Sequence, residues 1–192
     1  AKKFKPDVFL SFGSFYAAHV SKLIGKPNIV IDDTDQAYFG HMLYLPFTRF
    51  VITPLAFRKD FGKKHVRVNS YTELLYLHPK YFKPNPKIFS SLNIVAGTRY
   101  AVVRFVSWEA SHDLGHKGIS LSDRIRLIYE LQKQLRVFIS SENELPSALK
   151  EYKLPINSWE MHDVLAFSSI FIGESGTMSS EAAFLGVPSI QI

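Results

Sequence analysis

The chain contains no cysteine among its 192 residues. Disulfide bonds and metal sites with thiolate ligands are therefore excluded, and the composition is compatible with a reducing compartment such as the cytoplasm. No uninterrupted apolar run approaches the roughly 20 residues that cross a bilayer as a helix, and no signal-peptide pattern opens the chain. We therefore expect a soluble, cytoplasmic protein.

Acidic residues are fewer than basic ones: Asp and Glu number 17 against 23 Lys and Arg, a formal net charge of +6. This balance suits an anionic ligand or surface, so peripheral membrane association is compatible with the composition. A generally basic soluble protein explains the same balance, and we predict no nucleic-acid partner. Hydrophobic residues make up 46% of the chain, enough for one large or two small cores.

Short apolar runs alternate with amphipathic stretches along the chain. A strand pattern at 7–11, a helix pattern at 14–25 and a strand pattern at 28–32 open this series. The clearest helix is 121–135, where Ser120 begins a capping-box pattern ahead of one apolar stripe. Further strands are expected at 49–53, 65–69, 100–106, 136–140, 169–173 and 188–192. The alternation predicts parallel sheets covered by helices on both faces, a doubly wound α/β arrangement.

Residues 77–94 interrupt this alternation, because they contain three prolines and show no clean period. We predict a partial N-terminal α/β domain over 1–77, a proline-bearing connection over 78–94 and a C-terminal domain over 95–192. A long surface loop within one domain is the alternative. The chain begins without methionine and ends on a strand pattern, so we expect a fragment truncated at its N-terminus and open to truncation at its C-terminus.

The stretch GESGTMSSEAAFLGVPSI, residues 173–190, joins a strand pattern to a helix pattern through a polar turn. In a doubly wound sheet, ligands bind beyond the carboxyl ends of the strands, where the first N–H groups of a helix favour a phosphate. Glu181 lies one turn into the helix, with its side chain tilted back toward the turn. A carboxylate there can accept hydrogen bonds from a ribose diol. We predict nucleotide binding by this turn and Glu181; a capped helix with an exposed glutamate is the alternative. The turn residues are Gly173, Ser175, Gly176 and Thr177.

This stretch resembles the signature of the GT-B superfamily, above all UDP-N-acetylglucosamine 2-epimerase and its relatives. In that signature Asp-Ser-Gly-Gly is followed by Glu-Glu-Ala and Leu-Gly-x-Pro. Ser175, Gly176 and Glu181 fall on matching positions, which the resemblance assigns to the diphosphate and ribose of a UDP-sugar. Thr177 replaces the second glycine, and Ser180 replaces the first glutamate.

Two residues just before the signature strand join the predicted nucleotide site through the same resemblance. Met161 and His162 begin the preceding helix pattern, where related proteins place residues against the uracil ring. A His162 that only caps the helix and a Met161 that only fills the core are the alternatives.

The resemblance extends over nearly the whole chain. Five segments resemble an uncharacterised bacterial and archaeal family of GT-B-like proteins that carries a domain of unknown function. Members usually begin with a further strand and helix ahead of the first of these segments, and in GT-B enzymes that part commonly helps to bind the acceptor. The five segments are 6–37, 71–82, 103–118, 137–146 and 161–186.

The sequence HDLGH, residues 112–116, resembles the His-Glu-x-x-His zinc motif of metalloproteases. Two nearby glycines argue against the continuous helix that this motif requires. In the GT-B arrangement, a loop after strand 100–106 lies at the strand's carboxyl end, where Glu109 and His112 can contact sugar or phosphate. A loop in which both side chains form only local hydrogen bonds is the alternative.

Asp33 and Asp35 follow a strand pattern and imitate the Asp-x-Asp metal site of GT-A glycosyltransferases. Two carboxylates there would hold Mn²⁺ or Mg²⁺ against a diphosphate. The C-terminal signature favours the GT-B solution, in which the helix dipole and backbone N–H groups stabilise the diphosphate. We therefore predict no metal and no cofactor. A solvated acidic turn that caps the next helix is the alternative.

These features predict a GT-B-like protein with two Rossmann-like domains that binds a nucleotide-activated sugar, with UDP as the expected nucleotide, between its halves. We predict transfer of the sugar to a surface polysaccharide or lipid acceptor of unknown identity. Epimerisation or hydrolysis of the same donor is the second hypothesis, and a non-catalytic sugar-nucleotide-binding or interaction domain is the third. In the expected mechanism Asp33 is the base near the sugar and His112 donates to the diphosphate or leaving oxygen.

Overall fold

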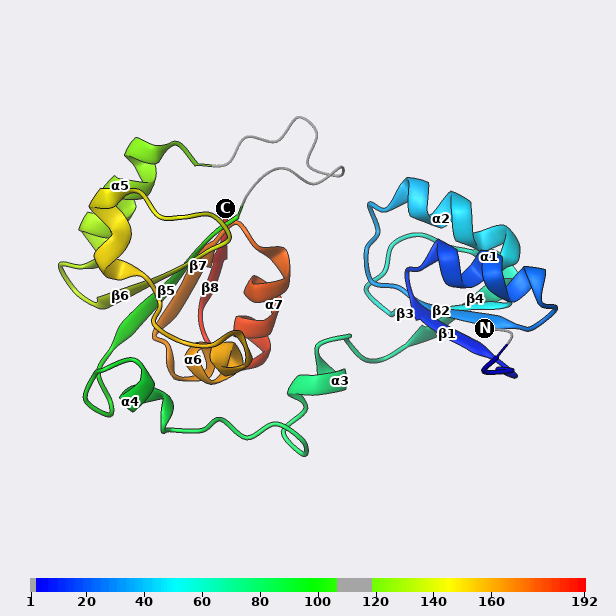
Figure 1. Cartoon of the computed structure of the whole chain (residues 1–192), viewed down its shortest axis with the longest axis horizontal. Coiled ribbons are helices and arrows are strands. Elements are labelled where there is room, and N and C mark those ends of the chain that lie inside the picture. The colour runs from blue at the N-terminus through cyan, green and yellow to red at the C-terminus, as the bar shows by residue number, and fades with distance from the viewer. Residues whose placement is uncertain (1–2, 107–118) are drawn as a thin grey trace. The chain divides into compact units, whose positions relative to one another are not determined.

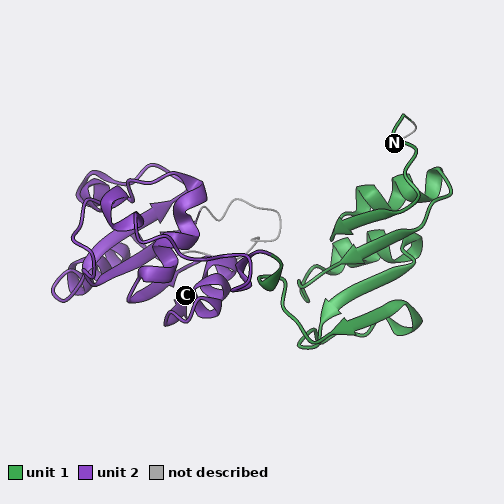
Figure 2. Ribbon diagram, turned by 90° about the horizontal axis from the view of Figure 1, so that it is seen from below, with its two compact units in different colours: residues 1–75 green, residues 76–192 purple. Residues whose placement is uncertain are grey.

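The computed structural model describes residues 3–106 and 119–192. The chain divides into two compact units, Ala1–Leu75 and Tyr76–Ile192 (Figure 2), and each has its own four-stranded parallel sheet. Across 3–106 and 119–192, no helix combines the length and the apolar character needed to cross a bilayer.

The first unit repeats strand and helix in simple order (Figure 1). Its sheet has the order β1-β2-β3-β4, the same as the order along the chain. Right-handed crossovers that proceed in one direction put their helices on one face of the sheet. Val30 and Val51 are fully buried and pack with Ala18 and Tyr44 on this face. The elements are β1 (Phe9–Phe12), α1 (Phe15–Leu23), β2 (Asn28–Ile31), α2 (Tyr38–Tyr44), η1 (Leu45–Phe47), β3 (Phe50–Pro54), η2 (Gly62–Lys64) and β4 (His65–Val68).

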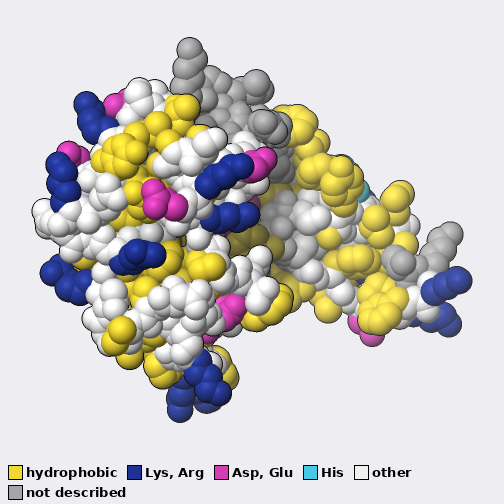
Figure 3. Space-filling view, turned by 60° about the vertical axis from the view of Figure 1, so that its left-hand side comes forward, with side chains coloured by type: hydrophobic (Ala, Val, Ile, Leu, Met, Phe, Trp, Pro, Cys, Tyr) yellow, Lys and Arg dark blue, Asp and Glu magenta, His cyan; other side chains and the backbone are white. Residues whose placement is uncertain are grey.

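The opposite face of this sheet is apolar and exposed. Leu10 pairs with Ile29, and Ile29 pairs with Phe50, so these side chains share one face. Leu10 is 66% exposed and Phe50 is 39% exposed. Figure 3 shows hydrophobic side chains gathered on the face of the first unit that is visible in that view. Parallel sheets are ordinarily covered on both faces. This face, by contrast, has no cover within the described part of the chain.

The second unit has the strand order β6-β5-β7-β8. Two clusters of buried residues lie around this sheet, one with α4, α6 and α7 and the other with α5. The fully buried Tyr100 donates its hydroxyl proton to the carbonyl oxygen of Val164 at 2.6 Å and so ties β5 to α6. The elements are α3 (Leu74–Leu77) at the junction of the units, α4 (Ile88–Ser91), β5 (Tyr100–Phe105), α5 (Leu121–Leu131), β6 (Arg136–Ser141), η3 (Ser147–Tyr152), η4 (Ser158–Glu160), α6 (Met161–Phe167), β7 (Ile170–Gly173), α7 (Gly176–Phe184) and β8 (Ser189–Gln191).

The predicted fold class is confirmed: all eight predicted strands are present, in two parallel sheets with interposed helices. The helix predicted at 121–135 is α5, and Ser120 caps it by accepting a hydrogen bond from the backbone N–H of Asp123. That 1–77 and 95–192 fold as separate domains joined by a connection over 78–94 stays a prediction. Ile88, Phe89 and Leu92, from the predicted connection, pack in the core of the second unit.

Candidate functional site

The carboxyl ends of β5 and β7 lie side by side in the second unit, where Arg104 pairs with Gly173. The direction in which successive strands are added to the sheet reverses here, because β6 lies on one side of β5 and β7 lies on the other. Such a topological switch opens a crevice beyond the carboxyl ends of the strands, where ligands bind in open α/β sheets. The predicted turn residues lie at this edge: Gly173 ends β7, Ser175 caps α7, and Gly176 and Thr177 begin α7.

Gly173 has no room for a side chain, and Gly176 has a close side-chain neighbour. A Cβ at Gly173 would lie 2.7 Å from the carbonyl oxygen of Arg104, and one at Gly176 would lie 3.3 Å from the side-chain nitrogen of Gln191. Ser175 is the N-cap of α7, and its hydroxyl accepts a hydrogen bond from the N–H of Met178 at 3.3 Å. Gly176 and Thr177 are exposed, and their N–H groups have no hydrogen-bond partner among the described residues. Two donors at the positive end of the helix are therefore available to an anion.

Glu181 is buried on α7, with 7% of its surface exposed. Its Oε1 atom accepts a hydrogen bond from the hydroxyl of Tyr76 at 3.0 Å and lies 3.1 Å from Nε2 of His162. The alternative predicted a capped helix with an exposed glutamate. The helix is capped, but Glu181 is not exposed. The sequence pattern did not indicate Tyr76, which lies 105 positions away along the chain.

His162 contacts two aromatic rings. The Tyr76 ring is tilted by 32° at a centroid distance of 5.5 Å, and the Phe82 ring meets His162 edge-on at 5.9 Å. The hydrogen bond to Glu181 raises the pKa of His162 above its ordinary value, against the opposing effect of burial. Met161 is partly buried and packs against the core. Its predicted contact with a uracil ring, like that of His162, stays a prediction.

Glu174 is a further residue of this edge that sequence reasoning missed. It is 5% exposed, and its carboxylate accepts hydrogen bonds from the N–H groups of Val106 and Ile119 at 2.9 and 2.8 Å. The guanidinium of Arg124 lies 3.2 Å from both carboxylate oxygens. Glu174 follows Gly173 directly, and this position within the glycine turn is the sequence feature that could have indicated it.

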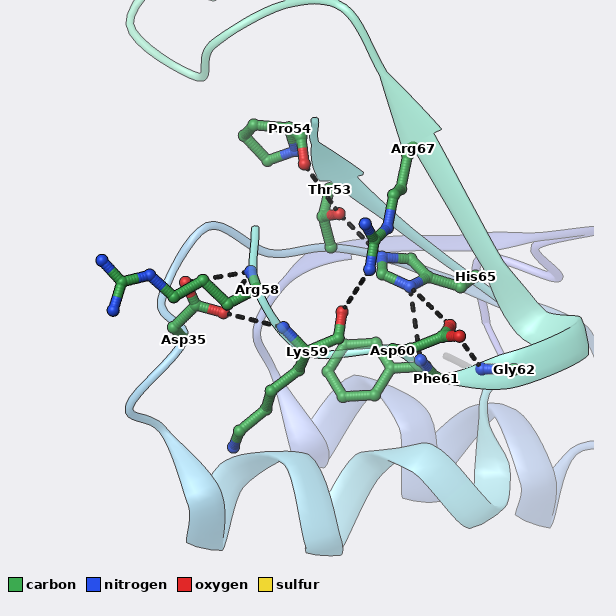
Figure 4. A network of polar contacts seen from close by, with 10 residues as sticks. All are labelled: Asp35, Thr53, Pro54, Arg58, Lys59, Asp60, Phe61, Gly62, His65 and Arg67. Atoms are coloured by element: carbon green, nitrogen blue, oxygen red, sulfur yellow. Dashed lines mark hydrogen bonds and ion pairs between the residues drawn. The ribbon is translucent and has the colours of Figure 1, made fainter. Parts of the chain in front are cut away.

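Asp33 and Asp35 lie in the first unit and have different partners. Asp33 is exposed, and its carboxylate accepts hydrogen bonds from the hydroxyls of Thr34 and Thr72. Asp35 instead binds the next loop, because it accepts a hydrogen bond from the N–H of Arg58 at 2.9 Å and one from that of Lys59 at 3.3 Å (Figure 4). Within the described ranges, no group of three or more His, Asp or Glu side chains is arranged to hold a metal ion.

The loop that Asp35 holds is fixed by a wider polar network (Figure 4). Asp60 accepts hydrogen bonds from the N–H of Gly62 at 3.0 Å and pairs with His65 at 3.3 Å. The other ring nitrogen of His65 lies 2.8 Å from the hydroxyl of Thr53, and Arg67 donates to the carbonyl oxygen of Lys59. These contacts assign Asp35 a role in holding the loop.

A second group that sequence reasoning missed is the buried cluster of Asp32, His41 and Tyr44. The Tyr44 hydroxyl donates to Asp32 at 2.6 Å, and burial together with this bond raises the pKa of Tyr44. Nε2 of His41 lies 3.3 Å from the same carboxylate, without the alignment of a hydrogen bond, and Nδ1 lies 3.0 Å from Nζ of Lys59. Burial lowers the pKa of His41, and the nearby Lys59 lowers it further against the effect of Asp32. A neutral His41 that accepts a hydrogen bond from Lys59 fits this environment.

The remaining predicted residues, Glu109 and His112, lie outside the described residues. The structure therefore brings together Gly173, Ser175, Gly176, Thr177 and Glu181 with His162 in the second unit. Asp33 lies in the first unit.

Two Rossmann-like parallel sheets, with a glycine-containing turn at the switch point of the second, define a GT-B-like protein of the α/β class. The chain belongs to the family described as "Protein of unknown function (DUF354)", whose model matches residues 1–192. No curated protein matches the chain.

Solved structures with the same fold include UDP-GlcNAc 2-epimerases. The enzyme from Methanocaldococcus jannaschii has a TM-score of 0.67 at 17% identity, over 99% of this chain and 62% of its own. A second structure of it, in complex with UDP-GlcNAc and UDP, has a TM-score of 0.62 at 16% identity, over 99% and 61%. The enzyme from Rickettsia bellii has a TM-score of 0.67 at 16% identity, over 98% and 56%. The chain therefore spans less than two thirds of these relatives, and at such identities the likeness shows the fold.

Proposed function

We propose that the second unit binds a nucleotide-activated sugar, with UDP as the nucleotide, at the carboxyl edge of β5 and β7. The observation that carries this proposal is the combination of two N–H groups, at Gly176 and Thr177, that have no partner within 3–106 and 119–192, with the buried carboxylate of Glu181 on the same helix. The first group suits a diphosphate and the second suits a ribose hydroxyl. The complex of the Methanocaldococcus jannaschii epimerase with UDP-GlcNAc and UDP, which has the same fold, supports this choice of ligand.

For the complete protein we propose transfer of the sugar to a surface polysaccharide or lipid acceptor. Asp33 is the proposed base, and Glu109 and His112 are the proposed contacts to the sugar and the leaving diphosphate. Epimerisation of the same donor is the second candidate, because the solved structures described above are 2-epimerases. Mass spectrometry of the products formed from UDP-GlcNAc, with and without lipid or oligosaccharide acceptors, distinguishes the two reactions.

The binding proposal is tested by calorimetry with UDP on the wild-type chain and on Glu181→Ala. Because a charge-assisted hydrogen bond is lost, we expect the variant to bind UDP about 10-fold to 100-fold more weakly. Glu130→Ala is the matched control, since Glu130 lies on α5, where it pairs with Lys133 at the surface. Unchanged affinity in a folded Glu181→Ala protein would contradict the proposal.

The catalytic proposal is tested with a complete homologous protein. Asp33→Asn should slow turnover and leave UDP binding intact, because a base acts in the reaction and not in nucleotide recognition. The assay is repeated with EDTA and then with added Mn²⁺ or Mg²⁺. Loss of binding and turnover on chelation, restored by metal and abolished by Asp33→Asn, would support a metal-dependent reaction instead.

A further inference from the structure

We propose that Tyr76 and His162 are positioning residues that hold Glu181 so that only its Oε2 atom is presented to a ribose hydroxyl. This inference rests on the proposed nucleotide site and adds the residues that set its preference for ribose. It also gives a positioning role to Tyr76, which lies at the start of the second unit and before the predicted connection.

The first argument concerns the two oxygens of the carboxylate. A carboxylate oxygen has two lone pairs for in-plane hydrogen bonds. Oε1 of Glu181 receives the Tyr76 hydroxyl at 3.0 Å and faces Nε2 of His162 at 3.1 Å. Oε2 has no hydrogen-bond partner among the described residues. A hydroxyl of the ligand that seeks the carboxylate therefore finds its acceptor at Oε2.

The second argument concerns how firmly the two donors are held. The rings of Tyr76 and Phe82, two residues that precede α4 in the chain, both contact the ring of His162. The N–H of Asn85 donates to the carboxylate of Asp163, the residue after His162, at 2.8 Å. The segment from Tyr76 to Asn85 is thus attached to α6 and α7 at three points. A donor on such a segment limits the rotamers of Glu181, which lowers the conformational cost of binding a hydroxyl.

The consequence is a preference that depends on Tyr76. With Glu181 held, a nucleotide with a ribose hydroxyl gains a charge-assisted hydrogen bond that a deoxyribose nucleotide lacks. Without the Tyr76 hydroxyl, Glu181 gains rotational freedom and this advantage shrinks. A purely structural role of Tyr76 would instead weaken the binding of all nucleotides alike.

The test compares UDP with 2′-deoxy-UDP and 3′-deoxy-UDP by calorimetry, on the wild-type chain, Tyr76→Phe and Tyr81→Phe. Tyr76→Phe should weaken UDP binding about threefold to tenfold, leave the binding of at least one deoxynucleotide unchanged, and so lower the preference for ribose. Tyr81→Phe is the matched control, because Tyr81 lies on the same segment, is 72% exposed and contacts His78. An equal loss of affinity for all three nucleotides, or no change in preference, would overturn the inference.

An independent measurement needs no nucleotide. In an NMR titration of the histidine rings, Tyr76→Phe should move the pKa of His162 down toward its ordinary value of 6.5, because a released Glu181 spends less time beside the ring. An unchanged pKa would show that Tyr76 does not hold Glu181. If the wild-type chain binds none of the three nucleotides, the proposed function fails and the ribose preference with it. The titration still decides separately whether Tyr76 positions the carboxylate.

Discussion

The carboxylate of Glu174 accepts four hydrogen bonds and is almost completely shielded from solvent. The side chain is 1% exposed and faces Arg124, which is 25% exposed, while two backbone N–H groups complete the set. A buried charge is tolerated only when its partners compensate for the lost hydration. Glu174 therefore fixes the ends of β5 and β7 relative to the start of α5.

Replacement of Glu174 by alanine should destabilise the second unit by about 2–4 kcal/mol, because Arg124 and two N–H groups lose their acceptor. Urea denaturation followed by circular dichroism measures this change. Glu130→Ala is the control: Glu130 and Lys133 form an ion pair at 2.6 Å with both side chains more than 60% exposed, and its loss should cost less than about 1 kcal/mol. Equal losses of unfolding free energy in the two variants would contradict the stabilising role assigned to the buried pair of Glu174 and Arg124.

His162 and His41, whose pKa values are shifted in opposite directions, should give opposite dependences of stability on pH. The pKa of His162 is raised by its bond to Glu181. Its contribution to stability is therefore fully present below the unfolded pKa of about 6.5 and is lost as the pH rises through the folded pKa. The pKa of His41 is lowered by burial. The contribution of His41 is present above about 6.5 and is lost as the pH falls through its folded pKa.

The measurement is the difference in unfolding free energy between the wild-type chain and each of His162→Gln and His41→Gln, from pH 5 to about pH 9. The difference for His162→Gln should decrease as the pH rises, and that for His41→Gln should increase. The same pH trend for both variants would show that one of the two assigned environments is wrong.

At the scale of the elements, β5 and β7 approach so closely at Gly173 that a side chain has no room. A Cβ there would lie 2.7 Å from the carbonyl oxygen and 2.8 Å from the Cβ of Arg104. Gly173→Ala should therefore cost about 1–3 kcal/mol through displacement of the strands. Gly40→Ala is the control, because Gly40 is in α2 and its nearest neighbour would be 3.9 Å away. This change should stabilise the first unit by about 0.5–1 kcal/mol. Denaturation midpoints that move in the same direction would contradict the packing described here.

At the same scale, the regular elements could be predicted and the short ones could not. The strands and the helices α1 and α5 show period-2 or period-3.6 patterns along enough residues to be recognised. By contrast, α3 and α4 have four residues each, too few for a helical period to appear. The stretch 78–94 therefore appears in the sequence as a proline-bearing connection without a regular period, although Ile88, Phe89 and Leu92 from it are buried in the second unit.

At the scale of the whole molecule, the boundary of the second unit can be tested with two fragments. Residues 76–192 should fold cooperatively. Residues 95–192 should be much less stable, because they lack Ile88, Phe89 and Leu92, and a buried apolar side chain contributes roughly 1.5–3 kcal/mol. All three are buried in the core with Tyr100 and Phe171. Thermal unfolding of both fragments measures the difference, and equal stability would instead favour the boundary at 95 that the proline pattern predicts.

The sequence alone determined where strands, helices and the glycine turn lie, because these features depend on neighbouring residues and on local periodicity. It also placed Glu181 on the helix that begins at that turn. Only the tertiary structure decided that Glu181 is buried and that Tyr76 and His162 share its Oε1 atom. The partners of a buried polar group come from distant parts of the chain, and no local pattern records which of them the fold brings together. For the same reason the structure, and not the sequence, distinguished the buried Asp32 from the exposed Asp33 beside it.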